Sequence, residues 1–220
     1  MADEAARERM VKEQIAGRGI TDVRVLAAIG KVPRERFVDA SAQGKAYEDH
    51  PLPIGFGQTI SQPYIVARMA LLARLRGTER VLEIGAGCGY ATAVLAELAA
   101  EVWGIEIIPQ LADAAAKRLA DLGYVSAHVE TGDGTHGWPE HAPYDAIVVA
   151  AGAPRVPALL LAQLAPGGRL IIPVGPRESQ RLVVVTRQAN EDFDTTYDIP
   201  VRFVDLTGRY GWGGSGAPSA

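Results

Sequence analysis

The sequence has 220 residues, 48% of them hydrophobic, which is enough to bury a full core in one domain. Its 22 basic and 26 acidic residues give a net charge of −4 without blocks of like charge, which argues against a nucleic-acid partner. A single cysteine, Cys88, excludes an internal disulfide and fits a reducing compartment.

The N-terminus is too charged for a signal peptide, and the longest apolar stretch, residues 146–153, is too short to cross a bilayer. We therefore expect a soluble, cytoplasmic protein with no membrane partner. The four histidines lack the close helical spacing of metal ligands, so we expect no metal site.

The start of the chain predicts a layer of helices. Residues 4–16 follow an amphipathic helical pattern that nearby glycines end. Thr21 or Asp22 can cap a second helix, which ends before Pro33. This layer must pack on something larger.

Residues 47–69 predict a shaped loop followed by a helix. Two prolines and two glycines between residues 51 and 57 argue against regular structure there, so we expect an irregular loop. Ser61 and Pro63 then open a helix through Leu72. A plain connector in which Ser61 only caps the helix is the alternative.

The sequence centres on residues 81–90, VLEIGAGCGY, where a short apolar strand ends in three glycines at alternate positions. An Ala-rich helical pattern follows over residues 91–100. Glycines allow positive φ and close approach of a ligand to the backbone, which predicts a nucleotide-binding turn. The even spacing differs from the dinucleotide fingerprint and argues against NAD. A plain strand-to-helix connection is the alternative.

Acidic residues follow the next two predicted strands. Glu106 ends the second strand, about 20 residues beyond the first glycine, where an acid can accept hydrogen bonds from both ribose hydroxyls. Asp133 lies in a glycine turn after the third strand, residues 126–129, and could meet an adenine amino group. The alternatives are an acid in the first turn of a helix for Glu106 and an ordinary Asx turn for Asp133.

The later chain alternates apolar runs with helical patterns, which predicts a parallel sheet that ends in a hairpin-like pair. Residues 150–154 form a small-residue connection where open α/β sheets place ligands, although a plain turn is the alternative. From residue 211 onward, Gly, Ser, Pro and Ala predict a disordered tail that includes Trp212. The remaining predicted strands are residues 145–149, 169–174, 182–187 and 199–204.

Several of these segments carry a family resemblance. Residues 47–55, YEDHPLPIG, with residues 57–63, GQTISQP, closely resemble the pre-cofactor signature of protein-L-isoaspartate O-methyltransferases. Residues 81–95 resemble the cofactor motif of that family, which belongs to the class I S-adenosylmethionine-dependent methyltransferases. The similarity covers about residues 9–207. Further motifs in the same order are residues 105–108, 132–134, 137–138, 144–149 and 164–176.

The resemblance implies an α/β fold with a Rossmann-like class I methyltransferase sheet, mostly parallel with an antiparallel C-terminal strand. The implied organisation is one domain, with N-terminal helices and a substrate loop in residues 1–74, the cofactor-binding sheet in residues 75–207, and a tail in residues 211–220. The implied cofactor is S-adenosyl-L-methionine, with S-adenosyl-L-homocysteine as product. The implied partners are isoaspartyl-containing peptides and proteins, and we expect a monomer.

The implied reaction methylates the isoaspartyl α-carboxylate of damaged proteins and starts repair through a succinimide. A carboxylate is already ionised at pH 7, so the reaction needs no general base. By resemblance, Thr59 and Ser61 are the catalytic residues. The implied cofactor-binding residues are Gln58, Ile60, Glu83, Gly85, Ala86, Gly87, Gly89, Glu106, Ile107, Asp133 and Gly134, and the implied substrate-binding residues are Ile54, Thr59, Ser61 and Val204.

The sequence departs from the family pattern at a few positions. Asp205 stands where the family usually has proline, Ala86 and Cys88 replace the commoner Thr and Ser, and Gly152 interrupts an Ala-rich segment. Two rival functions stay open. One is methylation of a normal aspartate in a dedicated precursor peptide, and the other is a regulatory module that binds the cofactor without transferring methyl groups.

Overall fold

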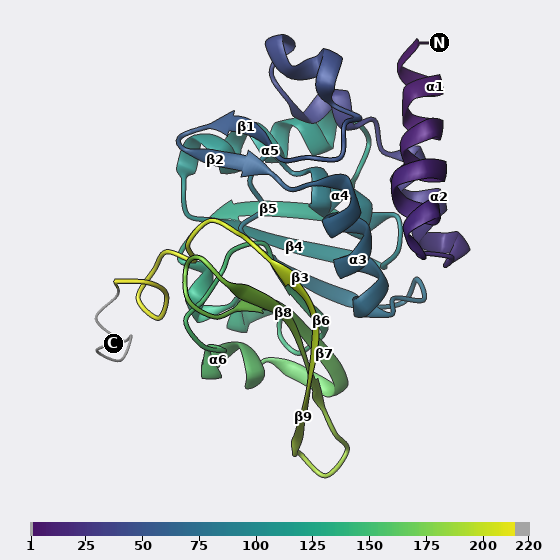
Figure 1. The fold of residues 1–220 in the computed structure, drawn as a ribbon. Helices are drawn as coiled ribbons and strands as arrows, with labels where there is room; N and C mark the ends of the chain where they lie inside the picture. Colours follow the sequence, from purple (N-terminus) through teal and green to yellow (C-terminus); the bar gives the residue numbers. More distant parts are fainter. Residues whose placement is uncertain (1, 214–220) are drawn as a thin grey trace.

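The computed structural model describes residues 2–213. A seven-stranded sheet forms its centre, in the order β5-β4-β3-β6-β7-β8-β9 (Figure 1). The first five strands of that order run parallel, whereas β8 and β9 are each antiparallel to the preceding strand. The strands are β3 (Arg80–Ile84), β4 (Glu101–Glu106), β5 (Ala127–Thr131), β6 (Tyr144–Val149), β7 (Leu164–Val174), β8 (Gln180–Arg187) and β9 (Phe193–Val201).

This topology confirms the predicted class I methyltransferase sheet with its antiparallel end. The strand order reverses at β3, which lies between β4 and β6, and such a switch point opens a crevice at the carboxyl ends of the strands. The last strand differs from the prediction, because it begins at Phe193 and ends at Val201 rather than spanning residues 199–204. Val204 therefore lies beyond the sheet.

Helices cover the sheet unequally on its two faces. The larger apolar cluster joins buried residues of α2 (Val23–Lys31), α3 (Pro63–Ala73), α4 (Tyr90–Ala96) and α5 (Pro109–Asp121) to one face. The opposite face packs on a smaller cluster that includes Leu160 of the short helix α6 (Ala158–Leu161). Two 3₁₀ turns, Gly134–His136 and Pro139–His141, take the place of a helix between β5 and β6.

The N-terminal layer largely follows the prediction. Helix α1 (Ala2–Arg9) continues as a π-helical segment, Met10–Ile15, and a 3₁₀ turn, Ala16–Arg18. The carboxylate of Asp22 caps α2, since it accepts hydrogen bonds from the backbone N–H groups of Arg24 at 2.9 Å and Val25 at 3.1 Å. Short 3₁₀ segments, Arg34–Phe37 and Ala40–Lys45, lead from α2 to the next element.

The predicted irregular loop between residues 51 and 57 is wrong. The chain forms a two-stranded antiparallel hairpin of β1 (Leu52–Gly55) and β2 (Gln58–Ile60), in which Pro53 pairs with Thr59. Each strand of an isolated hairpin has a free edge, so proline, which lacks an N–H group, is tolerated there. The glycines form the tight turn, because Gly55 and Gly57 have φ values of 90° and 72° around Phe56.

After β9, residues 202–213 leave the sheet and form a segment that we call the C-terminal strap (yellow in Figure 1). The Trp212 indole N–H donates a hydrogen bond to the Gly152 carbonyl at 2.9 Å, and the Trp212 backbone N–H donates to Leu206 O at 2.8 Å. Trp212 is therefore held in the fold, in contrast to the expected tail from residue 211. Residues 214–220 of that expected tail lie outside the described part of the chain. Within residues 2–213, no helix combines the length and apolarity needed to span a membrane.

Candidate active site

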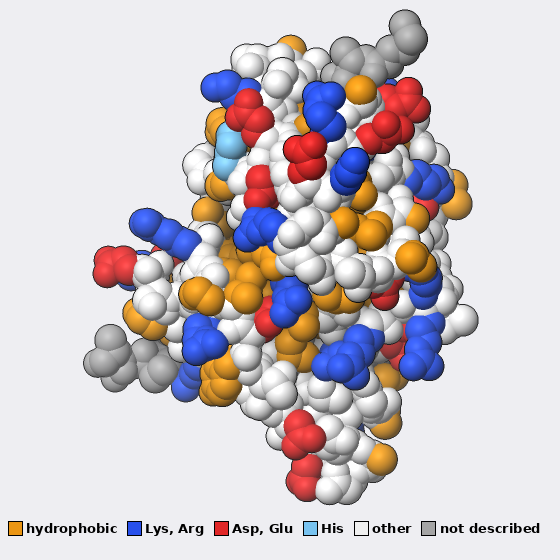
Figure 2. All heavy atoms as spheres, turned by 45° about the vertical axis from the view of Figure 1, so that its right-hand side comes forward, with side chains coloured by type: hydrophobic (Ala, Val, Ile, Leu, Met, Phe, Trp, Pro, Cys, Tyr) orange, Lys and Arg blue, Asp and Glu red, His pale blue; other side chains and the backbone are white. Residues whose placement is uncertain are grey.

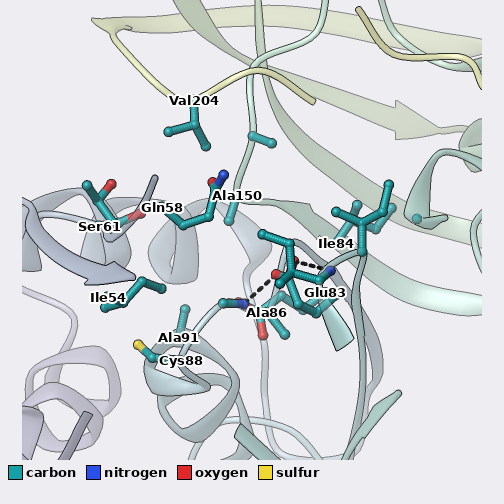
Figure 3. A pocket seen from close by; sticks show the side chains of 18 of the residues that line it. Ile54, Gln58, Ser61, Glu83, Ile84, Ala86, Cys88, Ala91, Ala150 and Val204 are labelled. Atoms are coloured by element: carbon teal, nitrogen blue, oxygen red, sulfur yellow. Dashed lines mark hydrogen bonds between the residues drawn. The ribbon is translucent and has the colours of Figure 1, made fainter. Parts of the chain in front are cut away.

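A cavity of about 310 Å³ lies at the carboxyl ends of β3 and β4, the size expected for a small-molecule site. Its walls come from the hairpin, the turn after β3, the end of β4, the start of the loop after β6, and the strap. In Figure 3, Ser61 and Ile54 lie on the hairpin side, Glu83 and Ala86 lie opposite, and Val204 approaches from the strap. This arrangement brings together segments from both ends of the chain.

The glycine turn after β3 is fastened to the end of β4. The N–H groups of Gly85 and Ala86 both donate to the Ile105 carbonyl, at 2.8 and 3.1 Å. Gly87 has a φ of 54°, and a Cβ at this position would lie 3.2 Å from Ile54 Cδ1. The positive φ therefore favours glycine at position 87, and a side chain there would also require Ile54 of the hairpin to shift slightly.

Glu106 is the acid that the spacing predicted at the end of β4. Its side chain is buried at the cavity wall, where Oε2 accepts a hydrogen bond from Gly87 N at 2.8 Å and Oε1 accepts one from Ile108 N at 3.0 Å. A carboxylate has about four acceptor positions, so both oxygens retain capacity for a ligand's hydroxyl groups. Glu106 thus lines the cavity, and its contact with ribose stays a prediction.

Glu83 on β3 lies at the base of the cavity and is fully buried. Its Oε2 accepts a hydrogen bond from the Thr92 hydroxyl, whereas its Oε1 has no hydrogen-bond partner among the described residues. Burial raises the pKa of Glu83 to about 8, although the Thr92 hydrogen bond acts in the opposite direction. At neutral pH the group is therefore mostly protonated, with one oxygen available to a ligand.

The structure separates Asp133 from Gly134. Gly134 lines the cavity, and a Cβ there would approach Ile84 Cγ2 to 2.5 Å. The Asp133 carboxylate instead accepts hydrogen bonds from Thr135 N at 2.9 Å and from Arg209 N of the strap at 2.8 Å. Burial alone would raise the pKa of Asp133, but these hydrogen bonds outweigh it and lower the pKa. The observed role of the carboxylate is to tie this loop to the strap.

Gly89 also lies away from the cavity wall. Its φ is 88°, and a Cβ there would lie 3.3 Å from Ala115 and 3.4 Å from Leu119. Gly89 thus allows the start of α4 to approach α5. The neighbouring Cys88 lines the cavity, and burial raises the pKa of its thiol, so it forms a small apolar part of the wall.

A second, more open cavity of about 790 Å³ adjoins the first. We call it the acceptor groove; Thr59, Ser61, Ala150 and Val204 line both cavities. On the face of the molecule in Figure 2, hydrophobic atoms are exposed in a hollow bordered by Lys and Arg side chains. The other residues that line the groove are Pro51, Gln62, Ile65, Pro200, Val201, Arg202 and Phe203.

Most of the predicted site residues meet at these two cavities. All predicted cofactor residues except Gly89 and Asp133 line the first cavity, together with all four predicted substrate residues. Ala150 and Ala151 also line it, as expected for the connection after β6. Residues 205–207 of the strap also line it; the sequence analysis noted Asp205 only as a departure from the family pattern and assigned none of the three to the site. Within residues 2–213, no group of three or more His, Cys, Asp or Glu side chains is placed to hold a metal ion.

Comparison with known proteins decides the family. The family model described as protein-L-isoaspartate(D-aspartate) O-methyltransferase matches residues 5–211. The chain belongs to this family. A Pelobacter propionicus protein named protein-L-isoaspartate O-methyltransferase 2 is 56% identical over 210 residues, which are 95% of this chain and 93% of that protein. The resemblance inferred from the motifs is therefore confirmed.

Two solved structures support the fold of this isoaspartate methyltransferase family. One, named protein-L-isoaspartate O-methyltransferase, has a TM-score of 0.82 and 29% identity, with 90% of this chain and 65% of that chain covered. The other, from Plasmodium falciparum and in complex with S-adenosyl-L-homocysteine, has a TM-score of 0.77 and 24% identity, with 93% and 98% covered. The Rossmann-like sheet described above is the fold that they share.

Proposed function

We propose that the chain methylates the α-carboxylate of isoaspartyl residues in damaged proteins, with S-adenosyl-L-methionine as the methyl donor. Family membership supports this activity and this cofactor. The observation that carries the proposal is the meeting of two cavities at Thr59, Ser61 and Val204. A donor in the enclosed cavity and a peptide in the open groove would have their reacting groups at this junction.

The residues of the enclosed cavity fit the cofactor. Gly87 leaves the turn free of a side chain beside Ile54, Glu106 offers carboxylate oxygens for ribose hydroxyls, and Glu83, whose Oε1 has no partner among the described residues, would pair with an ammonium group in its ionised form. Gln58, Ile60, Ile107 and Gly134 complete the proposed binding wall, and all four line the cavity. When bound, S-adenosylmethionine supplies an electrophilic methyl group on a cationic sulfur.

The junction is suited to an acceptor that is already charged. An acceptor carboxyl has a reference pKa near 4 and is ionised at neutral pH, so no proton must be removed before attack. The residues shared by the two cavities are Thr59, Ser61, Ala150 and Val204, none of which titrates near pH 7. This composition supports transfer without a general base.

The chain's contribution is alignment of the acceptor. We assign the Thr59 and Ser61 hydroxyls to donate hydrogen bonds to the carboxylate, and Ile54 and Val204 to form the apolar walls beside it. Neutral donors orient the carboxylate without neutralising it, and apolar walls exclude water that would solvate it. Holding two reactants in near-attack geometry can lower a barrier by about 7 to 11 kcal/mol.

The test is a pair of synthetic peptides that differ only in aspartate or isoaspartate, assayed for transfer of a radiolabelled methyl group. We expect wild-type turnover on the isoaspartyl peptide alone. Ser61→Ala should lower kcat/KM by about 10- to 100-fold, as loss of a hydrogen bond to a charged group does, with the dissociation constant for S-adenosylhomocysteine unchanged. Ser41→Ala, at an exposed position on a 3₁₀ segment, is the matched control and should retain full activity.

Other outcomes identify the rivals. Turnover of the aspartyl peptide only would indicate a peptide-tailoring methyltransferase, and cofactor binding with no methyl transfer to either peptide would indicate a regulatory module. Full activity of Ser61→Ala on the isoaspartyl peptide would remove this hydroxyl from the proposed mechanism.

We also infer that the enzyme acts as a cytoplasmic monomer on peptides and proteins and does not act on nucleic acid. The proposed site is complete within one chain, which supports a monomer. The net charge of −4 disfavours a polyanionic substrate, and a lone, buried cysteine suits a reducing compartment. Light scattering that shows a dimer at assay concentrations would contradict the first inference.

A further inference from the structure

A buried glutamine fixes the point where the C-terminal strap leaves the sheet. Gln180, the first residue of β8, is fully buried and pairs in register with Val201, the last residue of β9. Beyond Val201 the ladder ends, and the Phe203 backbone N–H donates instead to the Gln180 side-chain oxygen Oε1 at 2.8 Å. The side-chain amide therefore replaces a strand neighbour at the turn.

The Gln180 side chain also limits the size of the residue at position 152, in the loop after β6. A Cβ on Gly152 would lie 2.3 Å from Gln180 Nε2, so a side chain at this position would have to displace the Gln180 carboxamide. Gly152 in turn holds the strap, since its N–H donates to Val204 O and its carbonyl accepts from Leu206 N, both at 2.8 Å. The departure from the family pattern at Gly152 thus has a structural reason in its contact with Gln180.

The segment held in this way is one wall of the acceptor groove. Phe203 and Val204 line the groove together with Thr59 and Ser61. Gln180 itself lines neither cavity, so it acts only through the strap backbone. We propose that Gln180 is a positioning residue for the acceptor: its carboxamide holds residues 203–204 at the distance from Ser61 that an isoaspartyl peptide needs.

This inference rests on the proposed function and concerns binding of the acceptor. The glycine turn and Glu106 are held by β4, and within residues 2–213 neither forms a hydrogen bond with Gln180, so the cofactor side should not respond to the loss of its amide. Loss of one buried hydrogen bond should raise the KM for the peptide about ten-fold. We expect kcat at saturating peptide to change less than KM.

The chain contains a matched control. Gln163 is also buried, its Oε1 accepts from Trp138 N at 2.8 Å, and its Nε2 donates to His136 O at 2.7 Å. A Cβ on the adjacent Gly137 would lie 2.3 Å from Gln163 Oε1. Gln163 therefore clamps a loop in the same manner as Gln180, but neither it nor residues 136–138 line the acceptor groove.

The experiment compares Gln180→Met with Gln163→Met, because methionine keeps the length of glutamine and removes the amide. Peptide KM and kcat are measured at saturating S-adenosylmethionine, the dissociation constant of S-adenosylhomocysteine by calorimetry, and stability by urea unfolding. We expect Gln180→Met to raise the peptide KM about ten-fold and to change the dissociation constant of S-adenosylhomocysteine by less than about two-fold. Gln163→Met should lose a similar amount of stability but keep the peptide KM of the wild type.

An equal rise of peptide KM in Gln163→Met, or an unchanged KM in Gln180→Met, would overturn the proposal. If Gln180→Met does not fold, Gly152→Ala displaces the same side chain from its neighbour and is expected to raise the peptide KM; an unchanged KM there would overturn the proposal as well. Absence of wild-type turnover on isoaspartyl peptide would instead refute the proposed function, so the two failures are distinguishable.

Discussion

The cofactor side and the acceptor side of this molecule are built in different ways. The cofactor side consists of the ends of two adjacent parallel strands, β3 and β4, and the turn between β3 and α4, joined by backbone hydrogen bonds. The acceptor side consists mainly of residues 51–65, from the hairpin to the start of α3, and residues 200–204, from the end of β9 into the strap, which lie far apart in the sequence. Sheet geometry fixes the first, whereas the backbone of Gly152 and side-chain clamps such as Gln180 and Asp133 fix the strap of the second.

This difference indicates where change is tolerated. Strand ends in a parallel sheet cannot move independently, so substitutions at Glu83 or Glu106 should affect cofactor binding or the stability of the whole domain. The strap is held by two backbone hydrogen bonds to Gly152 and a small set of side-chain contacts, so substitutions there should adjust peptide recognition and spare the rest of the fold. The following predictions test this division, from the largest effect to the smallest.

The largest effect should come from the buried acid of the cofactor side. Glu83 has a folded-state pKa of about 8 against a reference of 4.5, so between these pH values the unfolded chain releases a proton that the folded chain keeps. The contribution of Glu83 to stability is therefore greatest below pH 4.5, falls as pH rises, and levels off above pH 8. The loss is about 1.4 kcal/mol per pKa unit, which amounts to a few kcal/mol.

Glu83→Gln removes this titration. Urea unfolding at pH 5, 7 and 9 should show that the free energy of unfolding of the wild type falls as pH rises, and that it falls much less in Glu83→Gln. At pH 9 the variant should therefore be more stable than the wild type. Parallel pH profiles for the two proteins would show that Glu83 titrates normally and that its burial carries no electrostatic penalty.

Glu106 should control cofactor affinity. Glu106→Ala removes the acceptor for Gly87 N and the proposed ribose ligand, and loss of hydrogen bonds to a charged group should weaken binding of S-adenosylhomocysteine about 100-fold or more. Calorimetry measures this change. Glu130→Ala, an exposed acid on the neighbouring strand β5, is the control and should bind normally. A larger effect of Glu106→Ala on peptide KM than on cofactor affinity would contradict the separation of the two sides.

The contrast between the two sides also explains what could be predicted from the sequence. Gly85 and Glu106 are separated by one strand–helix–strand unit, so their spacing in the sequence was enough to predict that both lie at one site. Both line the first cavity. The strap contacts of Asp133 and Gln180 join residues more than 20 positions apart through single side chains, and no periodicity records such pairs. The hairpin was missed because proline and glycine signal a break in most strands but suit an isolated hairpin and its turn.

On the acceptor side, the positive charge of Arg202 at the groove should affect which residues are preferred next to the isoaspartate in the peptide. Among the described residues that line the groove, Arg202 is the one that carries a charge, and its side chain is exposed. An isoaspartyl peptide with a neighbouring glutamate should show a KM a few-fold lower than its lysine counterpart, since exposed charge pairs contribute about 1 kcal/mol or less. Arg202→Glu should reverse the preference, and added salt should reduce it in both proteins. An unchanged preference in Arg202→Glu would place the peptide flanks elsewhere.

The smallest effect should come from Asp205, where the family usually has proline. The two hydrogen bonds between Gly152 and the strap use the Val204 carbonyl and the Leu206 N–H, so the bridge does not depend on the N–H of residue 205. The Asp205 carboxylate pairs with Arg177 at 2.7 Å, with 34% and 57% of the two side chains exposed. Asp205→Pro should therefore remove only an exposed ion pair, and the free energy of unfolding should change by less than about 1 kcal/mol.

The peptide KM of Asp205→Pro should stay within about two-fold of the wild type, and the small difference should vanish at high salt because screening already weakens the pair. Urea unfolding and peptide kinetics at low and high salt measure both effects. A large rise in KM that persists at high salt would mean that the aspartate shapes the peptide site through the backbone. The acceptor side would then depend on Asp205 as well as on the Gln180 clamp.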